Sequence, residues 1–191
     1  MKRIERSEVL DLGQYEEIRE QFRRRIIELK RLRRLSLGSN MTVLFENRDT
    51  VLYQIQEMIR TERITREDAI LHEIETYNDL LPERDELSAT VFIEFPEPAE
   101  RDRMLVALAG VEDKFYLEAE GSRAVARNET RGVLPGRTTA VHYMKFPLSA
   151  QAAAALRTGK VTAVVGVDHD AYRASVTVPP RSLEELAQDL A

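Results

Sequence analysis

The chain has 191 residues, of which 43% are hydrophobic and 32% are charged, as expected for a globular protein with one substantial core or two small ones. It contains no cysteine, which excludes disulfides, thiolate catalysis and cysteine-ligated zinc or iron–sulfur clusters. The net charge of −5 is uneven, because residues 1–37 hold 11 Lys and Arg against 7 Asp and Glu while the remainder holds 17 against 26.

An amphipathic helix is predicted over about residues 14–35. Its apolar residues recur at steps of three and four, namely Tyr15, Ile18, Phe22, Ile26, Leu29 and Leu32. The helix should stop before the breaker LGSN at residues 37–40, and a β-prone run at residues 42–45 follows. Arginines fill the other faces of this helix, and among them Arg23, Arg24 and Arg31 are the candidates for binding a partner.

Two shorter helices are predicted next. The first spans about residues 50–60 and turns Val51, Leu52, Ile55, Met58 and Ile59 inward. The second begins near Thr65, a good N-cap that is followed by two acidic residues, and ends before Pro82. These elements define an N-terminal helical region, residues 1–85.

From residue 86 onward the pattern changes to strands, and the same order of elements occurs twice. The segment SATVFIEF is a predicted strand, Pro98 suits the first turn of a helix, and KFYLEAEGSRAVAR is a predicted hairpin with Gly121-Ser122 as its turn. After the linker NETRGVLPGR, the segment TAVHYMKF, an alanine-rich helix capped by Ser149 and a second hairpin repeat that order.

We interpret residues 86–191 as a duplicated β-α-β-β domain, with repeats at about residues 88–129 and 139–178. Six identities support the match, among them Phe95 with Phe146 and Pro96 with Pro147. Because each unit buries only part of its apolar surface, the two units should pair. The expected fold is α+β: the helical region followed by one mixed six-stranded sheet with helices on one face.

A row of possible metal ligands lies on the helix before Pro82. At 100° per residue, Asp68, His72, Glu75 and Asp79 fall within about 60° of one another, with donors that suit iron, manganese or zinc. The apolar residues of this helix, Ile70, Ile74, Tyr77 and Leu81, centre roughly 160° away from that row. We therefore interpret the row as the water-facing side of the helix, with a metal site as the alternative.

His142 is the candidate catalytic residue. It shares a strand face with Met144 and Phe146, which places its imidazole on the core side of the sheet. It is either a core histidine with a satisfied hydrogen bond or a general base in a pocket, because burial tunes an imidazole near neutral pH. His169 lies in Asp168-His169-Asp170, the expected turn of the second hairpin.

The segments FENRDTVLYQIQEMIRTERI, HEIETYNDLLP, SATVFIEF and AVHYMKF resemble an uncharacterised bacterial family, a domain of unknown function. The resemblance covers nearly all of the chain. It implies a bacterial cytoplasmic protein, encoded near rubrerythrin-like and iron–sulfur oxidoreductase proteins, that works near redox or oxidative-stress chemistry. It implies no activity of its own.

Three functions remain open from the sequence. The first is a non-catalytic accessory protein, a homodimer, that docks on a redox partner without a cofactor of its own. The second is a metal-dependent enzyme or metal-binding protein that uses His72 and Glu75, or His142. RNA binding through the arginines is a third, although no recognised nucleic-acid module accompanies them. No apolar run has the length of a membrane span or a signal peptide, so we expect no membrane partner.

Overall fold

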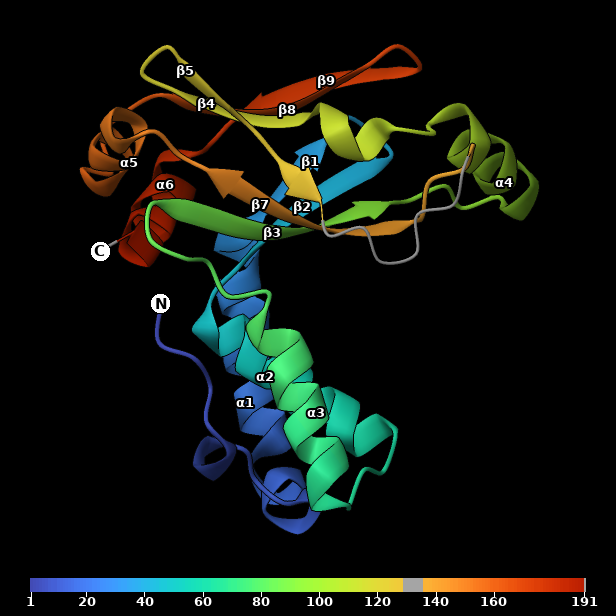
Figure 1. Cartoon of the computed structure of the whole chain (residues 1–191), viewed down its shortest axis with the longest axis vertical. Helices are drawn as coiled ribbons and strands as arrows, with labels where there is room; N and C mark the ends of the chain where they lie inside the picture. The colour runs from blue at the N-terminus through green and yellow to red at the C-terminus, as the bar shows by residue number, and fades with distance from the viewer. Residues whose placement is uncertain (129–135, 191) are drawn as a thin grey trace.

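The computed structural model describes residues 1–128 and 136–190. Two β-sheets lie one above the other, and a helical arm extends from the outer face of the first sheet (Figure 1). The linker expected at residues 128–137 therefore falls largely outside the described residues. No helix in the described ranges is long and apolar enough to cross a membrane.

The arm contains the three helices expected from the sequence. Helix α1 spans Leu12–Arg33, and its N-cap Asp11 accepts a hydrogen bond from the backbone N–H of Gln14. Helix α2 spans Arg48–Thr61 and is capped by Asn47, and α3 spans Glu67–Asn78. A short 3₁₀ turn, η1 at Arg6–Glu8, precedes them. The apolar faces of α2 and α3 enclose a core of their own, whose members include Val51, Ile55, Ile59, Ile70 and Ile74.

Helix α1 ends two residues earlier than predicted, because residues 34 and 35 already belong to a strand. Strand β1, Arg34–Leu37, pairs with β2, Met41–Glu46, in antiparallel register. Gly38 makes the turn with φ +68°, a conformation that side-chain-bearing residues rarely adopt. A Cβ at this position would also meet the hydroxyl of Tyr172, which donates to the carbonyl oxygen of Leu37.

The first sheet has five strands and the second has four, and every described pair is antiparallel. The first sheet runs in the order β1-β2-β3-β7-β6, with β3 at Glu86–Ile93, β7 at Val141–Pro147 and β6 at Arg127–Asn128. The second runs in the order β5-β4-β8-β9, with β4 at Phe115–Ala119, β5 at Ser122–Val125, β8 at Ala163–His169 and β9 at Tyr172–Thr177.

The prediction of one mixed six-stranded sheet is therefore wrong. The strands of one unit are divided between the two sheets. The first strands of the two units pair with each other, β3 with β7, and the second strands pair in the other sheet, β4 with β8. Each sheet covers one face of the other, and side chains from both form a single core. Helices α4, Pro98–Ala107, and α5, Ala150–Arg157, lie at opposite ends of this stack and not together on one face (Figure 1).

The order strand-helix-strand-strand does occur twice, as β3-α4-β4-β5 and β7-α5-β8-β9. The second unit is followed by α6, Pro180–Ala187, and the 3₁₀ turn η3, Gln188–Leu190, while η2, Val111–Lys114, precedes β4. That the two units are superimposable copies stays a prediction. Strands β2 and β3 lie on either side of the expected boundary at residue 85 and pair over six residues, so the first sheet joins the two expected regions.

Both hairpin turns lie one position or more from where we expected them. The first turn is Glu120-Gly121, where both residues have positive φ, as a two-residue hairpin of the primed type requires. Ser122 is instead the first residue of β5. The second turn follows His169, which is the last residue of β8 and pairs with Tyr172. The expectation that His169 lies in the turn is therefore wrong.

Candidate functional site

The four candidate metal ligands line the outside of α3. Asp68, His72 and Glu75 are exposed, and Asp79 is half-buried at the end of the helix. Asp68 forms an ion pair with Arg66, and Asp79 lies 3.9 Å from the guanidinium of Arg3. Among the residues that the structure describes, no three or more His, Asp or Glu side chains are grouped so that they could hold a metal ion.

His142 is buried on the inner face of β7, where its strand position placed it. Its Nε2 lies 2.9 Å from both the Thr138 hydroxyl and the carbonyl oxygen of Thr139, and the Thr138 hydroxyl donates to the buried Glu112 at 3.1 Å. Burial lowers the pKa of the imidazole, and the Glu112 carboxylate opposes that shift. The geometry is that of a neutral core histidine whose hydrogen bond is satisfied.

Several arginines of α1 form ion pairs with other parts of the chain. Arg33 is buried and donates to Glu185 and Asp189 near the C-terminus, which ties the arm to the end of α6. Arg19 forms a two-point ion pair with Glu57 on α2 at 2.7 and 2.8 Å. These contacts explain part of the charge asymmetry between the two halves of the chain.

The three arginines predicted to bind a partner are exposed. Among the described residues, Arg24 and Arg31 pair with carboxylates of α1 itself, Glu20 and Glu28, both at 3.0 Å. Arg23 interacts with Tyr53 on α2. Exposed pairs of this kind contribute about 0–1 kcal/mol, so these guanidiniums can exchange their partners at low cost.

The arm carries a groove of about 600 Å³ between α1, α2 and the N-terminal segment, and Arg25 of α1 lines it. We call it the arm groove. Its apolar lining is Leu10, Ile18, Phe22 and Leu52, and its polar lining includes Arg25 and Gln56. Ile18 is 43% exposed although the helical pattern places it on the apolar stripe.

Aromatic contacts fix the floor of the arm groove. The ring of Phe22 packs edge-on against Tyr15 and Tyr53, with centroids 6.3 and 5.6 Å away, and the guanidinium of Arg25 lies over it at 5.5 Å. The sequence pattern identified Ile18 and Phe22 as core residues. Their partial exposure could not be foreseen, because it depends on where the N-terminal segment and Leu52 lie.

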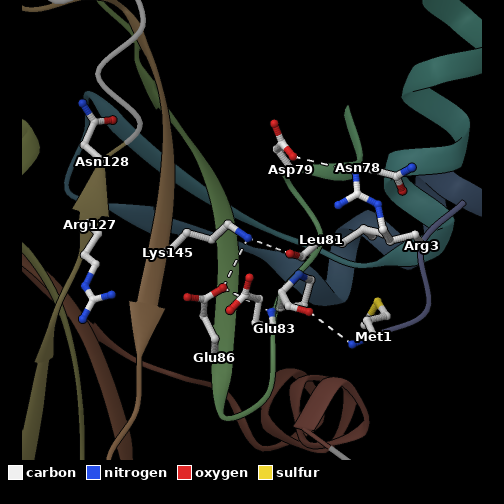
Figure 2. Close-up of a pocket in the computed structure, with 11 residues that line it drawn as sticks. Met1, Arg3, Asn78, Asp79, Leu81, Glu83, Glu86, Arg127, Asn128 and Lys145 are labelled. Atoms are coloured by element: carbon white, nitrogen blue, oxygen red, sulfur yellow. Dashed lines mark hydrogen bonds and ion pairs between the residues drawn. The ribbon is translucent and has the colours of Figure 1, made fainter. Parts of the chain in front are cut away.

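A second hollow, which we call the polar pocket, has a volume of about 490 Å³ and lies between the first sheet and the start of the chain (Figure 2). Its lining includes Asn128, three cationic side chains and three anionic ones. The cations are Arg3, Arg127 and Lys145, and the anions are Asp79, Glu83 and Glu86. The ammonium of Lys145 donates to the carbonyl oxygen of Leu81 at 2.6 Å and lies 3.2 Å from Glu86. No sequence pattern predicts this pocket, because four separate segments of the chain form it.

Known proteins that resemble this chain have the same fold and no assigned activity. A protein of unknown function from Burkholderia pseudomallei, known from a crystal structure, is 31% identical in sequence. The alignment covers 100% of both chains with a TM-score of 0.93. None of the curated proteins matches the chain. A family model described as "Protein of unknown function (DUF3501)" matches residues 3–190, and the chain therefore belongs to that family.

Proposed function

We propose that the chain is a non-catalytic interaction protein whose helical arm docks on an acidic surface of a partner protein. The arm groove carries this proposal, because it presents the exposed Ile18 and three half-buried apolar side chains directly beside Arg25. Ile18 and Phe22 offer apolar contact area, and the guanidinium of Arg25 lies over the Phe22 ring. Arg23, Arg24 and Arg31 extend the positive charge over the neighbouring exposed surface of α1. Apolar anchors next to arginine are the composition that most often dominates binding energy at protein interfaces.

Charge complementarity defines the partner. A segment that fits the arm groove needs an apolar side chain to cover Ile18 and Phe22, a carboxylate to meet Arg25, and further acidic residues to meet the arginines on the rest of α1. The arm extends away from both sheets, so a partner can reach α1 without displacing either of them (Figure 1). The family resemblance implies redox proteins as the class to which this partner belongs.

Charge reversal tests the arginines. The triple variant R23E/R24E/R31E should bind the partner at least about tenfold more weakly, because like charges would then face each other. The control is R66E/R84E/R173E, which makes the same charge change at exposed arginines that also sit in ion pairs, away from α1.

The measurement has two stages. The wild-type chain first captures partners from a native-like bacterial lysate, and each captured protein is identified and purified. Its affinity for wild type, triple variant and control is then measured by calorimetry. Weaker binding by the triple variant alone supports the proposal. Equal binding by all three chains, or capture of a second copy of this chain only, would contradict it.

A further inference from the structure

We propose that the polar pocket is a binding site for a small zwitterion of the amino-acid type, a molecule with one carboxylate and one ammonium. This inference does not depend on the arm groove, because the two hollows have no lining residue in common. The volume of about 490 Å³ lies within the range of small-molecule sites.

The walls of the polar pocket come from the N-terminal helical region and from the strands of the first sheet that follow it. Arg127 and Asn128 of β6 form one side, Lys145 of β7 and Glu86 of β3 lie in the middle, and Arg3 and Asp79 stand opposite (Figure 2). Strands β6 and β7 are hydrogen-bonded neighbours, with Arg127 opposite Lys145. The sheet therefore fixes one side of the pocket.

Asn128 provides the first sign of a missing ligand. Its side-chain oxygen is buried and accepts no hydrogen bond, and it is the one such side-chain atom among residues 1–128 and 136–190. A buried polar atom without a partner costs about 1–3 kcal/mol, and such atoms occur at strained positions and where a reaction, a bound water or a bound ligand uses them. A ligand N–H group would remove the cost once rotation of the half-buried Asn128 side chain turns this oxygen toward the pocket.

The charges of the pocket provide the second sign. Lys145 is paired with Glu86, and Arg3 faces Asp79, but neither Arg127 nor Glu83 forms an ion pair with another described residue. One unpaired guanidinium and one unpaired carboxylate thus line the same hollow. A guanidinium binds a carboxylate through two parallel hydrogen bonds, and a carboxylate accepts from an ammonium.

The balance of charges selects the ligand class. Three carboxylates of the pocket would repel a phosphate or a dicarboxylate, and three cationic side chains would repel a polyamine. A zwitterion avoids both penalties. Its carboxylate would meet Arg127, its ammonium would meet Glu83, and an N–H group of the ligand would donate to the Asn128 oxygen.

The experiment uses the whole chain and a defined panel of probes. Each of the standard L-amino acids is tested singly at millimolar concentration by calorimetry and thermal unfolding, with inorganic phosphate and putrescine as probes of a purely anionic or cationic site. We expect at least one amino acid to bind with one-to-one stoichiometry and to raise the melting temperature. Phosphate and putrescine should not bind at this site.

Three variants locate the site. Both R127M and E83Q alter exposed side chains and should fold normally while binding the amino acid at least about tenfold more weakly. The variant N128L should also lose binding but should be as stable as the wild type or more so, because it removes a buried unsatisfied oxygen. A purely structural asparagine would instead leave N128L less stable. R173M, on the second sheet, is the matched control.

The outcomes separate clearly. Binding of an amino acid that is lost in R127M, E83Q and N128L but kept in R173M supports the inference. No binding by any amino acid, binding of phosphate or putrescine in its place, or unchanged binding in R127M and E83Q would overturn it. None of these results changes the partner affinities that test the arm groove.

Discussion

Replacing Arg33 by methionine is expected to lower the free energy of unfolding by about 3–5 kcal/mol, because a buried ion pair loses one partner. The side chain of Arg33 is 1% exposed. Its guanidinium donates to Asp189 at 2.7 and 2.8 Å and to Glu185 at 2.9 and 3.2 Å. Methionine fills most of the volume but leaves a buried carboxylate without a cation.

The loss in R33M should depend on pH. Burial raises the pKa of the Asp189 carboxyl above its ordinary value of 3.8, and the Arg33 guanidinium opposes the rise. Without that guanidinium the folded state binds a proton more tightly than the unfolded chain, so stability falls as the pH rises above 3.8. The deficit relative to wild type should therefore be smaller at about pH 5 than at about pH 8.

Urea unfolding of wild type, R33M and the control R31M at both pH values provides the measurement. Arg31 lies on the same helix but is exposed and pairs with the exposed Glu28, so R31M should cost less than about 0.5 kcal/mol. A loss in R33M no larger than in R31M would show that the contact between α1 and the end of α6 does not hold the arm in place.

Truncating Phe146 to alanine is expected to cost about 3–5 kcal/mol, the usual range for a large aromatic side chain in a well-packed core. Phe146 is 0% exposed on β7, and its ring centroid lies 6.0 Å from that of Phe45 on β2. Both rings lie in the core between the two sheets. The variant would leave a cavity there that neighbouring strands cannot close without losing their register.

The matched control for F146A is V141A, because Val141 lies on the same strand with 40% of its surface exposed. We expect V141A to change the free energy of unfolding by less than about 0.5 kcal/mol. Equilibrium unfolding in urea, followed by circular dichroism, compares the two variants. Similar small losses in both would mean that the core between the sheets is not packed as described.

The helices were predictable because local signals define them. The apolar stripe from Tyr15 to Leu32 specifies α1, Pro98 begins α4, and Ser149 caps α5 by accepting from the N–H of Ala152. The burial of His142 was also predictable from the alternation along β7. Each of these predictions depends on residues of a single helix or strand.

The pairing of strands was not predictable in the same way. Whether β4 lies beside β3 or beside β8 depends on contacts between residues about 50 positions apart in the sequence. Both arrangements bury the same alternating faces of the strands. Strands β1 and β6 are too short to give a pattern. The arm groove and the polar pocket were missed for a related reason, since segments distant in sequence form each of them.

The account of function depends on the arm groove, and a photo-cross-linker placed at Ile18 tests it most directly. The chain offers a matched control at Leu71, an aliphatic residue of α3 in the same arm that is 47% exposed and lies outside the groove. We predict that p-benzoylphenylalanine at position 18 gives one cross-linked product with the identified partner and that the same group at position 71 gives none. Cross-links from position 71 alone, or from neither position while the partner still binds, would contradict the account.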